Sequence, residues 1–336
     1  MRRENTWILA RDSVYTKNLN ELFIMRPLVA INCLVYNHEP YLRDCLEGFV
    51  MQQTDFPFVA IVHDDASTDH SADIIREYAA KYPDIIHPIY ETENQWRKAD
   101  GSLRKIMDAA IEATGAPYIA LCEGDDYWTD PHKLQKQVDF LEAHPDYYIC
   151  YHVCKTLINS TGEMIIETVQ TIPNESTICD LSKGNYLQTL SVMYRYTDKI
   201  DHKRKMLDSC FPGDYVMWML LAEQGKIKRM DDVMGVYRSG VGVWSKNSEM
   251  RNMLSLLMTL VKLKMVIDIP QAQKNLQIQI EQLSNEIILH EAREYQALCK
   301  VHSSKAYRIG KIITLPMRWW RRLGKHISNI INNYSR

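Results

Sequence analysis

The sequence has few glycines and no long apolar segment. It contains 13 glycines in 336 residues, and no Gly-rich dinucleotide fingerprint or phosphate loop follows its first predicted strand. The sequence therefore lacks the loops with which dehydrogenases bind dinucleotides and nucleoside triphosphatases bind phosphates, which argues against both functions. No run of about 18 apolar residues marks a membrane-spanning helix. Residues 1–24 lack the apolar segment and cleavage site of a signal peptide, which predicts a cytoplasmic protein.

The eight cysteines lack the paired spacing of a zinc site or of a disulfide framework. Cys150, His152 and Cys154 alternate within a strand-like run, so their side chains share one face of a sheet. A metal cluster is one interpretation of this triplet. Reduced cysteines in the core are the other, and the frequent burial of this residue type favours it.

Charge is distributed unevenly along the chain. Residues 300–336 carry nine Lys or Arg and no Asp or Glu, whereas residues 1–299 carry 31 basic and 42 acidic residues. In the same segment, apolar residues around Trp319 recur on a different helical face from the bases, with Pro316 between two pieces. We predict peripheral contact with an anionic membrane, on the inner face of the cytoplasmic membrane. Packing against the acidic body is the alternative, and nucleic acid fits less well.

Strand-like and helix-like patterns alternate through the first half of the chain. Each apolar run is followed by an amphipathic segment that starts near Pro, Ser, Thr or Asp, as helices commonly do. The predicted strands cover residues 28–35, 56–62, 85–90 and 117–122, and the predicted helices begin near Pro40, Asp69, Ser102 and Asp130. This order predicts an α/β fold with a mainly parallel sheet and helices on both faces.

Polar clusters follow three of these strands. Glu123-Gly124-Asp125-Asp126 comes after the fourth strand, Asp64-Asp65 after the second, and Tyr36-Asn37-His38 after the first. Ligands of parallel sheets bind beyond the carboxyl ends of the strands, where these clusters converge. Carboxylates suit Mg²⁺ or Mn²⁺, so we interpret the acidic tetrad as a ligand site and not as a solvated turn. Asp64 is interpreted as a cap of its strand.

Three segments together resemble a known family. They read PLVAINCLVYNHEPYLRDCLEGFVMQQTDFPFVAIVHDDASTD, EGDDYWTDPHKLQKQVDFLE and FPGDYVMWMLL, in this order, over roughly residues 27–245. They resemble the inverting family 2 glycosyltransferases with the GT-A fold. The resemblance implies metal-dependent transfer of a sugar from a nucleoside-diphosphate sugar, with a UDP-sugar favoured. The acceptor would be a hydroxyl of a glycan or lipid-linked molecule in surface polysaccharide biosynthesis. A catalytically silent GT-A module that binds nucleotide or glycan is the alternative.

The resemblance also implies roles for residues near the donor. Tyr36 would stack near the base, and Asp65 would hydrogen-bond the base ring. The metal motif of the family falls on Glu123-Gly124-Asp125, where Glu replaces the first Asp. Asp125 is therefore the expected ligand of Mg²⁺ or Mn²⁺, and Glu123 and Asp126 are expected beside the donor.

Further roles fall on the second half of the chain. Asp214 matches the carboxylate that activates the acceptor, although an Asp that opens a helix also serves as an N-cap. Arg238 is expected at the donor, because the His that related sequences place nearby is missing. Thr189, Ser191 and Trp244 are weaker candidates for the acceptor pocket.

The domain organisation follows from these patterns. Residues 1–24 have little periodicity and no counterpart in the resemblance, so we expect them to be dispensable. Helical patterns at 250–266 and 272–298 would pack on the catalytic domain or form a homo-oligomer. The expected parts are the extension 1–24, the catalytic domain 25–248 with a nucleotide-binding half 25–145 and an acceptor half 146–248, the helical extension 249–299 and the basic segment 300–336.

Overall fold

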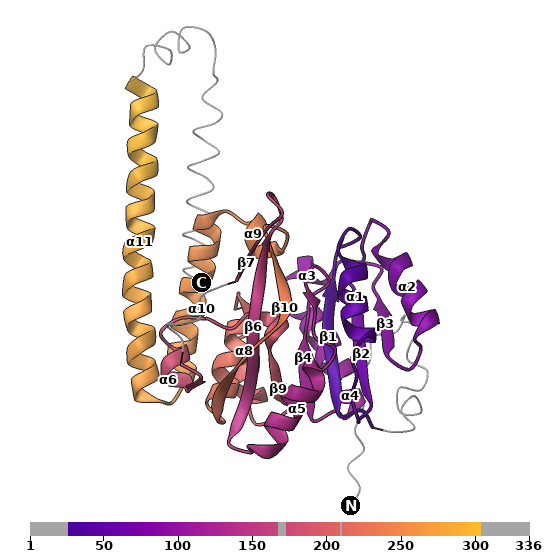
Figure 1. The fold of residues 1–336 in the computed structure, drawn as a ribbon. Helices are drawn as coiled ribbons and strands as arrows, with labels where there is room; N and C mark the ends of the chain where they lie inside the picture. Colours follow the sequence, from indigo (N-terminus) through magenta and orange to yellow (C-terminus); the bar gives the residue numbers. More distant parts are fainter. Residues whose placement is uncertain (1–25, 167–172, 209, 304–336) are drawn as a thin grey trace, which may run out of the picture. The chain divides into compact units, whose positions relative to one another are not determined.

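A computed structural model describes residues 26–166, 173–208 and 210–303 (Figure 1). The predictions for residues 1–24 and for the bases beyond Ser303 lie outside these ranges. Within them, one sheet organises the chain, with the strand order β3-β2-β1-β4-β9-β6-β10-β5. Two short strands lie off this path, since β7 pairs with β6 and β8 pairs with β10.

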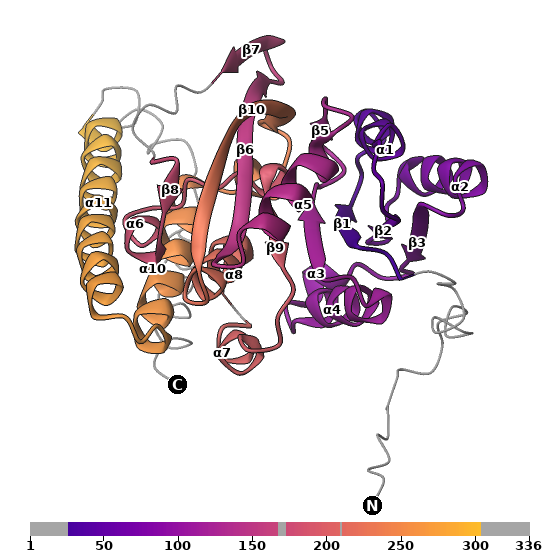
Figure 2. The ribbon, with the colours of Figure 1, turned by 60° about the horizontal axis from the view of Figure 1, so that its bottom comes forward.

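The first part of the sheet is parallel. Its strands are β1 (Val29–Val35), β2 (Phe58–Asp64), β3 (Ile86–Tyr90) and β4 (Tyr118–Leu121). The intervening helices are α1 (Leu42–Val50), α2 (Ser71–Lys81), α3 (Gln95–Lys98) and α4 (Ser102–Thr114). In Figure 2, α1 and α2 lie on one side of β1, β2 and β3, and α4 lies on the other. Both faces of β1 and β2 are consequently buried, and their sequences are almost continuously apolar.

The second part of the sheet mixes strand directions. Its elements are β5 (Tyr127–Trp128), α5 (Lys133–Ala143), β6 (Tyr147–Ile158), β7 (Glu163–Ile166), β8 (Glu175–Ser176), β9 (Met193–Arg195) and β10 (Lys226–Ser239). Strand β9 runs antiparallel to both of its neighbours, β4 and β6, whereas β10 is parallel to β6. The predicted α/β fold with a mainly parallel sheet is confirmed.

Several helices begin later than the sequence pattern predicted. Helix α1 begins at Leu42, two residues after Pro40, and α5 begins at Lys133. The residues before α5 form a turn in which Asp130 Oδ1 accepts a hydrogen bond of 2.8 Å from the His132 amide. Asp side chains commonly bond the backbone two residues later, which delays the helix.

Helices dominate the last part of the described chain. They are α6 (Ile178–Leu181), η2 (Thr189–Ser191), α7 (Asp201–Met206), α8 (Gly213–Ala222), α9 (Val243–Lys246), α10 (Glu249–Val266) and α11 (Pro270–Ser303). Both predicted helical patterns are confirmed. The boundary between two compact units lies inside α11, after Gln282. Before it, Asn275 Nδ2 donates to Cys179 O at 2.7 Å and Gln279 Nε2 to Ser182 O at 2.7 Å. No helix of the described ranges is long and apolar enough to span a membrane.

Gly225 generates a prediction about stability. Strands β6 and β10 approach closely there, since a Cβ on Gly225 would lie 2.6 Å from Asp146 O and 2.6 Å from the Tyr148 ring. Gly225→Ala should therefore lower the free energy of unfolding by about 1–3 kcal/mol in urea titrations. A Cβ on Gly213 would meet no atom within 4 Å. Gly213→Ala is the matched control, and equal stability of the two variants would contradict the close approach.

Candidate active site

The acidic tetrad lies in the loop between β4 and β5, and Asp126 anchors it. Asp126 is buried, and its Oδ1 accepts a hydrogen bond of 2.8 Å from the backbone amide of Arg238 in β10. Burial, followed by the negative charge of Asp125, raises the pKa of Asp126 well above its ordinary value. One oxygen of Asp126 thus holds the loop to the sheet, and the predicted donor contact of this residue stays a prediction.

Asp125 has a buried oxygen without a partner. Its Oδ1 accepts no hydrogen bond, while His38 Nε2 lies 4.0 Å from Oδ2. The backbone also passes close by, because a Cβ on Gly242 would lie 3.4 Å from Oδ2. An orphaned hard oxygen in a group of carboxylates fits Mg²⁺ or Mn²⁺. Among the described residues, no three His, Cys, Asp or Glu side chains already form a metal-binding set. A metal here would therefore take further oxygen ligands from substrate or water.

Glu123 and Asp214 complete the acidic site. Desolvation, then the charges of Asp125 and Asp214, raise the pKa of Glu123 to about 8. Glu123 is nonetheless an exposed residue of this loop. Burial also raises the pKa of Asp214, although Tyr215 N and Thr189 Oγ1 donate to it at 2.7 and 3.3 Å. The structure thus brings Asp125 and Asp214, 89 positions apart in the sequence, into one electrostatic site.

The position of Asp214 in α8 differs from that of an N-cap. The N-cap residue is Pro212, and Asp214 is the second residue of the helix. Its carboxylate bonds the amide of the next residue, Tyr215, in the first turn. Negative charge is favourable at this end of a helix. The capping role that sequence analysis left open for Asp214 is therefore replaced by a contact inside the first turn.

Hydrogen bonds join the loops that follow β1 and β2. The backbone N–H of Asn37 donates to Ser67 Oγ, and the backbone N–H of His38 donates to Ser71 Oγ, each at 2.9 Å. Asn37 adopts a left-handed conformation (φ 56°), which Asn tolerates better than most residues. The same loop carries Tyr36, whose ring lies 5.6 Å from the Arg97 guanidinium. The convergence of polar clusters expected at the strand ends is therefore confirmed for these two loops.

Asp65 and Asp64 differ in how many of their carboxylate oxygens accept hydrogen bonds. Both oxygens of Asp65 accept backbone hydrogen bonds from α3, at 2.6 Å from Gln95 and 3.0 Å from Trp96. Asp64 accepts from the Ser67 amide through Oδ2 at 3.3 Å, but its buried Oδ1 has no partner. Burial raises the pKa of Asp64. Asp65 is thus the more fully occupied of the pair, and its contact with a base stays a prediction.

Positive charge near the site comes from an unexpected residue. The Arg238 guanidinium donates to Asp44 and lies 5.1 and 4.8 Å from the rings of Tyr41 and Tyr127. Its buried Nε has no partner, and the expected donor contact of Arg238 stays a prediction. Burial lowers the pKa of the His38 imidazole, the charge of Asp125 opposes this shift, and the charge of Lys246 in α9 lowers the pKa further. Sequence reasoning missed Lys246 because no motif surrounds it, whereas His38 was visible in the first polar cluster.

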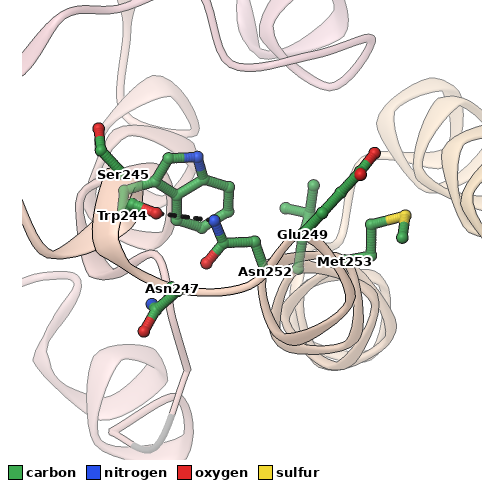
Figure 3. A pocket seen from close by; sticks show the side chains of 7 residues that line it. Trp244, Ser245, Asn247, Glu249, Asn252 and Met253 are labelled. Carbon is green, nitrogen blue, oxygen red and sulfur yellow. Dashed lines mark hydrogen bonds between the residues drawn. The ribbon is translucent and has the colours of Figure 1, made fainter. Parts of the chain in front are cut away.

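The candidate pocket residues have separate positions. Thr189 contacts Asp214, as described above. Ser191 is fully buried and donates to Gln188 O at 2.6 Å, so its hydroxyl takes no part in the site. Trp244 is 40% exposed and lines a cavity of about 360 Å³ (Figure 3). The sequence did not indicate its neighbour, Phe211, whose ring centre lies 5.6 Å from that of Trp244.

Comparisons with known proteins agree on one family. The model described as Glycosyl transferase family 2 matches residues 33–199. A relative in Mycobacterium tuberculosis, an uncharacterized protein, is 35% identical over 217 residues, which cover 64% of this chain and 60% of that protein. The matched part therefore spans less than two thirds of the length of this relative.

Solved structures share the fold at lower sequence identity. S. aureus TarS 1–349 in complex with UDP-GlcNAc superposes with a TM-score of 0.53 and 16% identity, over 86% of this chain and 77% of that one. The mannosyltransferase PcManGT of Pyrobaculum calidifontis, in complex with GDP-Man and Mn²⁺, has a TM-score of 0.53 and 15% identity over 86% and 84%. These similarities establish a GT-A-like fold.

The backbone before Asp214 generates a prediction about Thr259 of α10. The buried Thr259 hydroxyl accepts from the Phe211 amide at 3.0 Å and donates to Phe211 O at 2.9 Å. Thr259→Val keeps the shape but leaves two backbone groups unpaired, which should lower the free energy of unfolding by about 1–3 kcal/mol. Hydrogen exchange of the Phe211 amide should also accelerate. Thr259→Ser keeps the hydroxyl and is the control. If the Phe211 amide exchanged as slowly in Thr259→Val as in the wild type, the two hydrogen bonds would not hold this backbone.

Proposed function

The chain belongs to glycosyl transferase family 2, and from this membership we propose that it is a metal-dependent, inverting glycosyltransferase. It moves a sugar from a nucleoside diphosphate to a hydroxyl of a glycan or of a lipid-linked acceptor, in surface polysaccharide biosynthesis. The observation that carries the proposal is the meeting of Asp125, with its unpaired oxygen, and Asp214 in one site. A silent binding module would not need the raised pKa of the half-buried Asp214, which a general base does need.

The donor side of the proposal rests on oxygen ligands and nearby cations. Asp125 would hold Mg²⁺ or Mn²⁺, with Glu123 beside it, and such an ion would supply Lewis-acid stabilisation of negative charge on the diphosphate. Lys246, whose charge acts on His38, supplies positive charge that favours an anionic ligand. The complexes of TarS with UDP-GlcNAc and of PcManGT with GDP-Man support a nucleotide sugar as the donor, among which we favour a UDP-sugar. The nine bases of residues 300–336 support contact with an anionic membrane.

Asp214 is the general base of the proposed reaction. Each of its oxygens accepts one hydrogen bond, Oδ1 from the Tyr215 amide and Oδ2 from the Thr189 hydroxyl, so the orientation of the carboxylate is fixed. Burial raises its pKa, which makes it a stronger proton acceptor than an exposed Asp. The acceptor hydroxyl loses its proton to Asp214 and attacks the sugar carbon opposite the leaving group. This single displacement inverts the anomeric configuration.

Asp125 generates a test of metal binding. Mn²⁺ with UDP should raise the melting temperature of the wild type, and Asp125→Asn should abolish the increase because the carboxylate ligand is lost. The increase should grow between pH 6 and pH 8, since protons compete with the metal for Glu123, whose pKa is about 8. Asp139→Asn, at an exposed position of α5, is the control. A pH-independent increase that survives in Asp125→Asn would refute the site.

Asp214 generates a test of the reaction itself. Asp214→Asn can still accept the Tyr215 hydrogen bond but cannot take a proton, so the rate of transfer should fall by about 10²- to 10⁴-fold. Binding of UDP with Mn²⁺, measured by calorimetry, should change by less than about threefold. The donors to assay are UDP-, GDP- and dTDP-sugars. Wild-type protein that binds a nucleotide but cleaves none of these donors would support the silent module instead.

A further inference from the structure

The first part of α11 supplies hydrogen-bond donors to the end of the short helix α6. A helix of four residues leaves most of its carbonyl groups without partners inside the helix. Asn275 Nδ2 donates to Cys179 O at 2.7 Å and to Ser182 Oγ at 3.0 Å. Gln279 Nε2 donates to the carbonyl of Ser182, the C-cap residue, at 2.7 Å. Two amide side chains of α11 therefore replace the donors of a further helical turn.

Gln279 also reaches the helix that carries Asp214. Its Nε2 donates to the Tyr215 hydroxyl at 3.2 Å, and this hydroxyl donates in turn to Leu181 O at 3.0 Å. The Tyr215 side chain is buried, so water has little access to replace either partner. One amide group of α11 thus bonds both the end of α6 and the residue that follows Asp214.

The same two parts of the chain hold the Asp214 carboxylate. The Tyr215 amide donates to Asp214 Oδ1 at 2.7 Å. Thr189, in the segment after α6, donates to Oδ2 at 3.3 Å, and the Asn185 side chain of that segment also hydrogen-bonds Asp214. Each of these donors belongs to Tyr215 or to the segment that starts at the end of α6, and Gln279 bonds both.

We propose that Gln279 is a positioning residue for Asp214: it holds Tyr215 and the segment after α6, and these set the direction of the carboxylate. The inference rests on the proposed function, in which Asp214 is the general base. Displacement of a reacting group by about 1 Å can lower a rate by a factor of about 100. The family model ends at residue 199, so this role falls on a part of the chain that the model does not cover.

Gln273 of the same helix provides a matched comparison. Its Nε2 donates to Ile267 O at 2.8 Å, and Ile267 is the C-cap residue of α10. Both glutamines are partly buried, and each bonds the carbonyl of a helix C-cap, so Gln273→Leu and Gln279→Leu should lower the stability by similar amounts. The bond of Gln273 joins α11 to α10 and not to α8. The pair of variants therefore separates stability from positioning.

Positioning is tested first without the reaction, by hydrogen exchange of the Tyr215 amide in the full chain. This amide donates to Asp214 Oδ1, so its exchange reports how firmly the carboxylate is held. Gln279→Leu should accelerate the exchange about tenfold, which corresponds to the loss of one hydrogen bond. Tyr215→Phe, which keeps the ring and removes the hydroxyl, should accelerate it as well. If the amide exchanged no faster in Gln279→Leu than in Gln273→Leu, the assignment would be wrong.

Hydrolysis of UDP-, GDP- and dTDP-sugars with Mn²⁺, in which water is the acceptor, gives the second measurement. Gln279→Leu should lower kcat about 10- to 100-fold and leave KM for the donor within about threefold, because it changes the base and not the donor contacts. In the Asp214→Asn background the same substitution should cause no further loss, since residues that act through one another are not additive. An equal loss in both backgrounds, or an equal loss in Gln273→Leu, would contradict the positioning role.

The two measurements distinguish this inference from the function on which it rests. Wild-type protein that cleaves none of these sugars would refute the proposed function, while exchange of the Tyr215 amide still decides whether Gln279 holds the carboxylate. Hydrolysis by the wild type together with unchanged exchange and unchanged kcat in Gln279→Leu would refute the positioning role alone.

Discussion

The site depends on one buried hydrogen bond, from the Arg238 amide to Asp126. The acidic loop leaves the sheet after β4 and returns as β5, which pairs with β10 through Tyr127 and Trp128. The Asp126 bond holds the start of this return at 2.8 Å. Because the loop is fixed at both its strands, Asp125 cannot turn toward solvent, and its Oδ1 remains buried and unpaired. Donor binding in the proposed reaction therefore uses an oxygen that the fold has prepared.

Fixing like charges together has an electrostatic consequence. Burial raises the pKa values of Glu123, Asp126 and Asp214, and repulsion from neighbouring carboxylates adds to this effect for Glu123 and Asp126. A divalent cation reverses the repulsion and favours the ionised forms. The packing of the sheet stabilises an arrangement that the side chains alone would not adopt, which is common where a protein stores strain for function.

Local sequence patterns predicted the helices and strands better than they predicted which residues contact one another. The helices after β1, β2 and β4 were visible from apolar spacing. Two of them, α2 and α5, begin later than predicted because Asp69 and Asp130 accept backbone hydrogen bonds in the preceding turns. The same holds for the candidate site residues: a motif indicates their position but not their hydrogen-bond partners. The place after an apolar run indicated the tetrad that contains Asp125, whereas nothing in the sequence indicated that both oxygens of Asp65 accept backbone amides of α3. The occupancy of a carboxylate depends on residues distant in sequence, so no motif reports it.

The sequence by itself determined the α/β order, the acidic tetrad after β4 and the family, because these follow from periodicity and short motifs. Tertiary structure alone decided that Arg238 is engaged by Asp44, that Ser191 is buried, and that Lys246 lies near His38. It also decided that Trp96, Phe211 and Trp244 meet. The physical reason is that hydrophobic burial has a period that a single segment reveals, whereas a contact between two loops is set by the whole sheet that carries them.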